Sequence, residues 1–253
     1  MAVMLVDGTR YDGSMNQPAR GGRRVAYFGG SFDPPHLGHL AVARAALEAL
    51  GLDTVLFAPV GAQPLKPLGS TASFEDRLAM TRLAIAGEPE FAISLADAPK
   101  PAGAPNFTLD TLMDLRAGLP PGCALFCLMG ADSFFGLRRW HRAAEIPFIA
   151  PLIVASRPGQ QLDGLRAALP PGLTMESESC LGETDSGVEV RRYLLSNGAG
   201  EHTPFYLLPD LDVEISASAV RAQVRAGQGS ALSAQELLPA AVSAYVLSHG
   251  LYR

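Results

Sequence analysis

Two alternating patterns of hydrophobic and polar residues fill the chain from residue 25 onward. Short apolar runs have the length of buried strands, whereas the stretches between them carry apolar residues every three or four positions, as one face of a helix does. The runs predict strands over 25–28, 54–58, 91–95, 124–129, 148–155 and 205–208. The periodic stretches predict helices over 40–50, 74–86, 108–117, 216–226 and 237–247. This alternation is typical of an α/β fold: a doubly wound parallel sheet with helices on both faces, here with a small C-terminal helical part.

The expected domain boundaries lie where these patterns stop. Residues 1–24 are rich in Gly, Arg and polar residues without periodicity, so we expect a flexible leader there and a single domain over 25–253. Between 157 and 202 the pattern weakens, because Pro170-Pro171-Gly172 interrupts it and 176–187 is acidic and Ser-rich. We therefore expect a loop-bearing insertion at about 157–202.

Composition and charge narrow the class of partner. A chain of 253 residues with 48% hydrophobic content can bury one substantial core. Its net charge of −5 argues against nucleic acid or an anionic membrane, since both are bound by clustered Lys and Arg. The apolar opening is too short for a signal peptide and no later stretch would span a bilayer, so we expect a cytoplasmic protein. Cys123, Cys127 and Cys180 lack the spacing of a zinc site, and no metal ligands are predicted.

The segment Gly29-Gly30-Ser31-Phe32-Asp33-Pro34-Pro35-His36-Leu37-Gly38-His39-Leu40 directly follows the first expected strand. It has neither the GxGxxG spacing of a dinucleotide site nor the Lys-Ser/Thr of a P-loop. Instead, His36 and His39 flank Gly38 at the start of a helix, where backbone N–H groups and the helix dipole favour an anion. Gly38 would let a phosphoryl group approach the backbone between the two rings. The alternative is that one His packs against the helix and the other is exposed.

A second polar cluster, Ile215-Ser216-Ala217-Ser218-Ala219-Val220-Arg221, opens a helix after the last expected strand. Ser216 is placed as its N-cap. The hydroxyls of Ser216 and Ser218, the free N–H groups of the first turn and Arg221 could together bind a polyphosphate. The alternative is an ordinary capped helix with a solvated Arg.

Together, an HxGH motif after a glycine-rich first strand and an ISxxxxR element near the C-terminus resemble the nucleotidyltransferase superfamily with a Rossmann-like fold. Within it, the chain resembles the bacterial nicotinate-nucleotide adenylyltransferases. The blocks that carry this resemblance cover most of 25–253: GGSFDPPHLGHL at 29–40, FEDRLAM at 74–80, FTLDTL at 107–112, GADSFFGLRRW at 130–140, ISASAVR at 215–221 and LPAAVSAYVLSHGLY at 238–252.

The resemblance implies adenylyl transfer from ATP to nicotinate mononucleotide, giving nicotinate adenine dinucleotide and pyrophosphate, in NAD biosynthesis. It implies four catalytic residues, His36, His39, Lys66 and Arg221. The implied ATP-binding residues are Gly29, Gly30, Ser31, Phe32, His36, Gly38, His39, Ser216, Ser218 and Arg221. The implied nicotinate mononucleotide-binding residues are Thr108, Asp132 and Trp140, with the indole ring stacked on the nicotinate. For Thr108 and Trp140, a helix cap and a core residue are the respective alternatives.

The chain departs from the family's pattern after the second expected strand. The family commonly has a Pro-Pro-His-Lys-like run there, whereas this chain has Gln63-Pro64-Leu65-Lys66, so Leu65 stands where the usual His would be. Lys66 still supplies positive charge. We expect Mg²⁺ to accompany ATP and to be held by phosphates and water, because the chain has no carboxylate cluster dedicated to it. The expected partners are small-molecule substrates, and a homo-oligomer is compatible with the sequence.

Two alternative functions remain open, and only the second belongs to a different class. A sister enzyme would use nicotinamide mononucleotide, phosphopantetheine or glycerol phosphate as the acceptor; Thr108 and Trp140 favour a pyridine ring, but backbone groups can distinguish the acid from the amide. A non-catalytic nucleotide sensor would keep the pocket without turnover. The retained donors His36, His39, Lys66 and Arg221 disfavour it, because electrostatic catalysis needs such donors. A redox enzyme would need the absent GxGxxG turn.

Overall fold

The computed structural model describes residues 22–66, 69–156, 162–183, 188–209, 211, 215–226 and 237–253. Of the expected leader, residues 1–21 lie outside this part of the chain, and the first strand begins at Arg24. Within the described ranges, every helix is too short or too polar to span a lipid bilayer.

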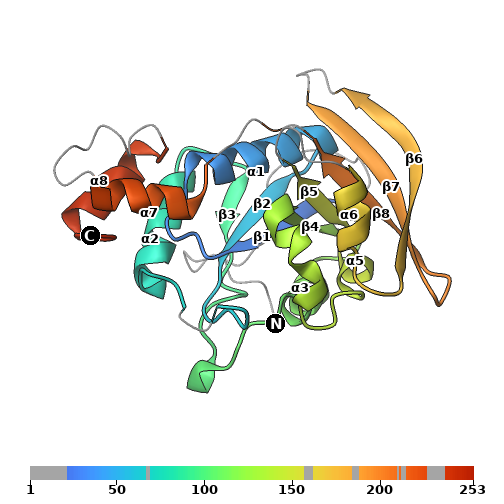
Figure 1. Cartoon of the computed structure of the whole chain (residues 1–253), viewed down its shortest axis with the longest axis horizontal. Coiled ribbons are helices and arrows are strands. Elements are labelled where there is room, and N and C mark those ends of the chain that lie inside the picture. Colours follow the sequence, from blue (N-terminus) through green and yellow to red (C-terminus); the bar gives the residue numbers. More distant parts are fainter. Residues whose placement is uncertain are drawn as a thin grey trace.

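A single twisted sheet forms the centre of the molecule (Figure 1). In the described part of the chain it has eight strands in the order β3-β2-β1-β4-β5-β8-β7-β6. The parallel strands are β1 (Arg24–Gly30), β2 (Thr54–Pro59), β3 (Phe91–Ile93), β4 (Ala124–Gly130), β5 (Leu152–Ala155) and β8 (His202–Leu208). Their order is that of a doubly wound dinucleotide-binding fold, which confirms the predicted fold class. The order reverses between β1 and β4, so the crevice beyond their carboxyl ends is the expected ligand site.

Helices cover both faces of this sheet. One face packs against α1 (Leu37–Leu50), α2 (Phe74–Ile85), α7 (Ala217–Ala226) and α8 (Ala240–Ser248). The other packs against α3 (Thr108–Gly118), α4 (Ala131–Phe135), α5 (Ile146–Ile149) and α6 (Leu162–Ala168). Two short 3₁₀ helices are η1 (Pro101–Gly103) and η2 (Leu137–Arg139). The C-terminus lies beside α2 and α8 (Figure 1).

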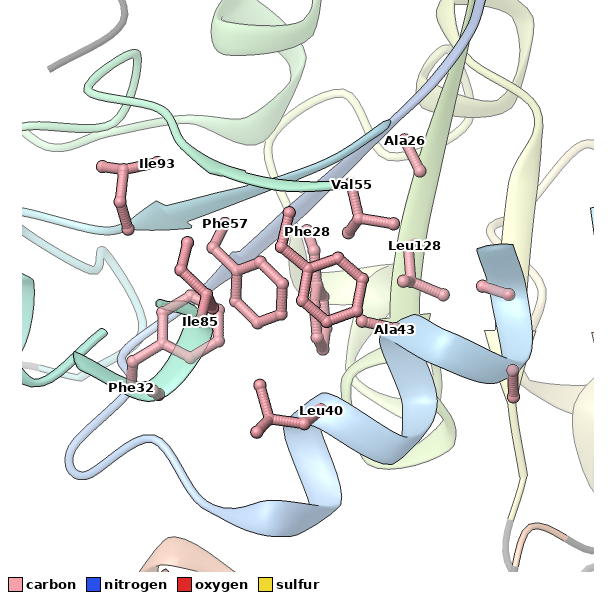
Figure 2. Packing of buried hydrophobic residues seen from close by; sticks show 14 of the residues in the cluster. Ala26, Phe28, Phe32, Leu40, Ala43, Val55, Phe57, Ile85, Ile93 and Leu128 are labelled. Carbon is pink, nitrogen blue, oxygen red and sulfur yellow. The ribbon is translucent and has the colours of Figure 1, made fainter. Parts of the chain in front are cut away.

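The central strands β1, β2, β4 and β5 are largely apolar because both of their faces are buried. In β1, Ala26 and Phe28 point into the core under α1, whereas Val25 and Tyr27 point into the opposite core. Figure 2 shows the first of these cores, with the aromatic rings of the sheet packed against Leu40 of α1. Continuous apolar runs are typical of parallel strands covered on both faces, and they place the turn after β1 on a rigid base.

The segment 157–202 departs from the expected loops. Residues 173–183 form β6 (Leu173–Glu183), and this strand pairs antiparallel with β7 (Glu189–Asn197), which pairs antiparallel with β8. In β7, buried Val190, Tyr193 and Leu195 are interspersed with polar residues. Tyr193 and Leu195 pack in one core and Val190 packs in the other, so neither face of β7 is continuously apolar and the strand is easily mistaken for a polar loop.

The expected strand over 148–155 is wrong at its beginning. The chain forms the short helix α5 first, and β5 follows after Pro151. A continuous apolar run does not distinguish a buried helix from a buried strand by its periodicity, and Pro147 sits in the first turn of α5, where proline is well tolerated.

Candidate active site

A cavity of about 900 Å³ opens beyond the carboxyl ends of β1 and β4. This is within the usual size of a small-molecule site. The cavity brings together all the site residues expected from the sequence: Gly29, Gly30, Ser31, Phe32, His36, Gly38, His39, Lys66, Thr108, Asp132, Trp140, Ser216, Ser218 and Arg221. The exposed side chain of Leu65 also lines it.

His36 and His39 are fixed against each other at the start of α1. His36 occupies the N-cap position, and its backbone N–H donates to Nδ1 of His39 at 3.1 Å. The two rings stack with their centroids 3.7 Å apart. Because Nδ1 of His39 accepts this bond, the neutral ring carries its proton on Nε2. Burial, and secondarily the neighbouring His36, hold the pKa of His39 well below its usual value. His39 is therefore a neutral donor.

The glycine turn after β1 is closely packed. A Cβ on Gly29 would lie 2.0 Å from the hydroxyl oxygen of Tyr27, so a side chain is excluded there. Phe32 has a left-handed backbone with φ 47° and is 1% exposed, and its ring meets that of His39 edge-on at 5.0 Å. A non-glycine residue in this conformation stores strain that the surrounding packing must maintain. The turn is thus a rigid support for His39.

The loop after β2, which contains Gln63 and Lys66, orients Ser31. The Oγ of Ser31 accepts hydrogen bonds from Nε2 of Gln63 and from Nζ of Lys66, both at 2.9 Å. With two donors on the oxygen, the Ser31 proton is directed elsewhere and can be donated to a ligand. Burial lowers the pKa of Lys66, with Asp33 acting in the opposite direction. The sequence reasoning included Lys66 but missed Gln63, whose only signal is its place after a strand end.

Arg221 reaches the glycine turn from α7. Its Nη1 donates to the main-chain oxygen of Asp33 at 2.7 Å and lies 3.9 Å from the Asp33 carboxylate, and its Nη2 donates to Oγ of Ser218 at 3.2 Å. Oγ of Ser216 accepts the N–H of Ala219 at 3.2 Å, which confirms the expected N-cap. Two segments 188 residues apart thus meet at one point.

Arg77 is a buried residue that the sequence reasoning did not identify. It is 2% exposed, and its guanidinium donates to the main-chain oxygens of Ser31 at 2.7 Å and Val60 at 2.8 Å. It therefore joins the ends of β1 and β2. Its signal was the FEDRLAM block, in which a lone Arg interrupts an apolar helix face.

We call the residues Ser31, Asp33, His36, His39, Lys66, Ser218 and Arg221 the histidine–arginine side of the pocket.

The opposite sheet face supplies the rest of the pocket wall. Thr108 begins α3, Asp132 lies in the first turn of α4, and Trp140 follows η2. The rings of Phe107 and His141 lie beside each other with centroids 4.5 Å apart. Asp132 and His141 are exposed, and Trp140 is partly buried. We call Phe107, Thr108, Asp132, Trp140 and His141 the tryptophan side.

A buried hydrogen-bond network forms the base of the pocket next to Thr108. The hydroxyl of Tyr27 donates to Oδ2 of Asp97, and Oγ1 of Thr111 donates to Oδ1 of Asp97 at 2.5 Å. Asp97 is 2% exposed, and burial raises the pKa of both Asp97 and Tyr27. Asn106 connects the loop that contains Asp97 and Ala98 to the loop after β2. Its side chain donates to Ala98 O and accepts from Ala62 N, both at 3.0 Å.

Among the described residues, no group of His, Cys, Asp and Glu is arranged to hold a metal ion. Asp33, whose carboxylate lies 3.9 Å from Arg221, already accepts backbone N–H groups of Thr71 at 2.6 Å and Ala72 at 3.0 Å. Cys127 is buried in β4, where burial raises the pKa of its thiol to about 12, as for a core residue.

Comparison with known proteins finds one family model and many relatives. The model is described as cytidylyltransferase-like and matches residues 27–223. The chain is 37% identical to a protein of Gloeobacter violaceus named probable nicotinate-nucleotide adenylyltransferase, over 91% of this chain and 97% of that protein. It is 39% identical to a protein of Stenotrophomonas maltophilia with the same name, over 90% and 96%.

Solved structures show the same fold. Nicotinic acid mononucleotide adenylyltransferase of Plasmodium falciparum complexed with NaAD matches with a TM-score of 0.64 and 15% identity, over 91% of this chain and 97% of that one. The same protein complexed with APC matches with a TM-score of 0.63 over equal shares of both chains.

Proposed function

Because the chain belongs to the cytidylyltransferase-like family and, within it, to the nicotinate-nucleotide adenylyltransferases, we propose that it transfers the AMP part of ATP to nicotinate mononucleotide. The products are nicotinate adenine dinucleotide and pyrophosphate, in NAD biosynthesis. The observation that carries the proposal is the meeting of His36 and His39 with Arg221 at the turn after β1.

In this reaction, a phosphate oxygen of the acceptor attacks the α-phosphorus of ATP in line. A new P–O bond forms as the bond to the bridging oxygen of the β-phosphate breaks, and pyrophosphate leaves with the electron pair. No covalent enzyme intermediate is needed, so the protein acts by positioning and by stabilising charge.

The neutral His39 supports this role. Its Nε2–H is directed away from the bond that Nδ1 accepts and can donate to an α-phosphate oxygen whose negative charge grows in the transition state. A fixed donor in a largely buried site is more effective than water, since it needs no reorientation. Ser31 offers a second oriented donor through the proton that Gln63 and Lys66 leave available.

Arg221 and Ser218 are suited to the leaving pyrophosphate. A planar guanidinium binds phosphate oxygens with two parallel N–H groups, and the first turn of α7 adds backbone N–H donors. Lys66 contributes further positive charge next to Ser31. We assign these residues to the β- and γ-phosphates and His36 and His39 to the α-phosphate.

The tryptophan side is suited to the pyridine nucleotide. The indole of Trp140 offers a flat face on which a nicotinate ring can stack, with Thr108 and Asp132 as polar neighbours in the pocket wall. The negatively charged Asp132 would have to bind hydroxyl groups of the ribose, since it would repel the phosphate and the ring carboxylate.

Mg²⁺ fits this site only as a companion of the substrate. The Asp33 carboxylate is occupied by backbone and side-chain donors, so the ion would be held by ATP phosphates and water. When bound, it neutralises phosphate charge during transfer.

The test is pyrophosphate release with ATP and Mg²⁺, comparing nicotinate mononucleotide, nicotinamide mononucleotide and phosphopantetheine. We expect rapid release with the first acceptor. Release with another acceptor alone would overturn the proposed substrate, and ATP binding without release from any of them would make the chain a nucleotide sensor.

A further inference from the structure

Asp33 connects three segments that are far apart in the sequence. It is 4% exposed, and its carboxylate accepts the backbone N–H groups of Thr71 and Ala72, just before α2. Its Oδ1 also accepts the hydroxyl of Tyr252, 219 residues away, at 2.8 Å. Arg221 binds the main-chain oxygen of the same residue at 2.7 Å and lies 3.9 Å from Oδ2. The C-terminal tail and Arg221 therefore meet on one aspartate.

Tyr252 is held firmly in this position. Its side chain is 5% exposed, and its backbone has φ 64°, a conformation that a bulky residue adopts only when its surroundings enforce it. The tail is anchored to α8 by the hydrogen bond from Leu251 N to Val246 O at 3.0 Å. Burial, and next the charge of Asp33, raise the pKa of Tyr252 far above its usual value. The hydroxyl therefore stays protonated and donates to Asp33 throughout the neutral range.

The surrounding charges explain why Asp33 needs such a donor. Lys66, Arg77 and Arg221 all interact with this carboxylate, so it balances three cations at the base of the phosphate site. A carboxylate that could rotate would favour one cation over another. With Thr71 N on Oδ2, and Ala72 N and Tyr252 on Oδ1, its orientation is fixed and so is the oxygen that faces Arg221.

We propose that Tyr252 is a positioning residue of the adenylyl-transfer site, whose hydroxyl fixes Asp33 and through it the direction of the Arg221 guanidinium. The inference rests on the proposed function only in that Arg221 binds the phosphates that leave. It makes the C-terminal tail part of the machinery for pyrophosphate departure, although Tyr252 itself does not touch the substrate.

The experiment compares Tyr252→Phe with Tyr245→Phe. Tyr245 also connects the C-terminal region to α2, through a 3.0 Å hydrogen bond to Asp76, but Asp76 does not line the pocket, whereas Asp33 does. We expect Tyr252→Phe to lower kcat/KM for ATP about tenfold and to weaken inhibition by added pyrophosphate to a similar extent, as the loss of one buried charge-assisted hydrogen bond would. KM for nicotinate mononucleotide should match that of Tyr245→Phe. The melting temperature should fall further than in Tyr245→Phe, because the hydrogen bond of Tyr252 is buried and that of Tyr245 is only partly buried.

A double-mutant cycle tests whether the effect passes through Arg221. In an Arg221→Lys background, Tyr252→Phe should lower kcat/KM less than about twofold, because the guanidinium it positions is gone. Equal losses in both backgrounds would overturn the proposal, as would equal kcat/KM values for Tyr252→Phe and Tyr245→Phe. A Tyr252→Phe protein that does not fold would assign the hydroxyl to stability and would also count against the proposal.

A second variant provides a chemical rescue. Tyr252→Gly suits the left-handed backbone and leaves a space for an added aromatic molecule. Phenol should restore kcat/KM for ATP, whereas toluene, which has the same shape without the donor, should not. Equal rescue by both would show that the ring alone matters. If the wild-type chain releases no pyrophosphate with nicotinate mononucleotide, the proposed function fails, and this is seen before any variant is compared.

Discussion

The two sides of the pocket are built differently. On the histidine–arginine side, Lys66 and Ser218 are exposed, but side chains from distant segments fix the buried centre: His36 and Asp33 are 6% and 4% exposed, and Arg221 and Tyr252 reach the same turn from the C-terminal part of the chain. On the tryptophan side, Asp132 and His141 are exposed and lie on short helices and turns. Buried polar contacts lie beneath this side, in the Tyr27–Asp97–Thr111 network.

This difference separates two tasks. Stabilising charge at a reacting phosphorus requires donors that are fixed before the substrate arrives, since reorientation during the reaction costs part of the gain. Binding an acceptor ring requires shape and a flat face, which side chains can complete when the ligand enters. We therefore expect changes on the histidine–arginine side to affect kcat and changes on the tryptophan side to affect KM for the acceptor.

The largest expected effect is that of His39→Ala. Loss of one fixed donor to a transition-state oxyanion lowers kcat by about 10²- to 10³-fold, or roughly 3–4 kcal/mol. Steady-state pyrophosphate release measures it, with His202→Ala, at an exposed position on β8, as the matched control. A fall in kcat of less than tenfold with normal ATP binding would mean that the histidine–arginine side does not stabilise the transition state as proposed.

Trp140→Ala tests the role of the tryptophan side. Loss of a stacking surface typically weakens binding of an aromatic base by about 1–3 kcal/mol, so KM for nicotinate mononucleotide should rise at least about fivefold with little change in kcat. Trp140→Phe should retain most of the affinity, because it keeps a flat ring. If kcat falls instead of KM rising, the two sides do not divide the work as proposed.

The sequence predicted the parts of this site that depend on local pattern. The glycine turn, the two histidines and the N-cap Ser216 follow from spacing that strand ends and helix starts impose. The parallel core of the sheet was predictable for the same reason, because a short apolar run between helical stretches has few alternatives. The roles of the site residues stay proposals.

What the sequence did not predict are pairings between distant residues. Gln63 with Ser31, Arg77 with Val60 and Tyr252 with Asp33 are set by how the chain packs, and no local spacing indicates which residues pair. The β6–β7 hairpin was missed because Glu189, Arg191 and Arg192 lie between the buried residues of β7 and interrupt its apolar alternation. Short-range patterns give the frame of the site, whereas long-range contacts give its rigidity.

Tyr27→Phe should weaken the base of the tryptophan side. It leaves Oδ2 of the buried Asp97 without its donor, which costs about 1–3 kcal/mol of unfolding free energy. Urea denaturation measures the loss, and Tyr245→Phe, whose hydrogen bond is only partly buried, should cost less. We also expect KM for nicotinate mononucleotide to rise more than KM for ATP. The reverse order would place Tyr27 with the phosphate site.

The stability of the protein should depend on pH through His39, on the histidine–arginine side. The pKa of folded His39 is held below the value of 6.5 that it has when unfolded. As the pH falls through 6.5, the unfolded chain takes up a proton that the folded chain does not, so stability is lost on the acid side. Compared with His39→Asn, the wild type should lose up to about 1.4 kcal/mol more per pH unit below this value. Urea denaturation at pH 7.5, 6.5 and 5.5 measures the difference in unfolding free energy between the two proteins, and a difference that does not change with pH would contradict a neutral imidazole.

Gln63→Leu should have the smallest effect of these variants, and it tests whether a single donor to Ser31 affects kcat. The variant keeps the size of the side chain but removes one of the two donors to Oγ of Ser31, while Lys66 keeps the other. Loss of one neutral hydrogen bond should lower kcat about threefold, without a change in KM for nicotinate mononucleotide. Lys66→Met should lower kcat more, because it removes a charge as well as a donor.

If Gln63 acts only by orienting Ser31, then Gln63→Leu should have no further effect in a Ser31→Ala background. An undiminished effect there would mean that the amide contacts the substrate directly. In that case Gln63, in the loop after β2, would bind ATP directly. Part of the histidine–arginine side would then take its final arrangement only when the ligand enters, as we expect of the tryptophan side.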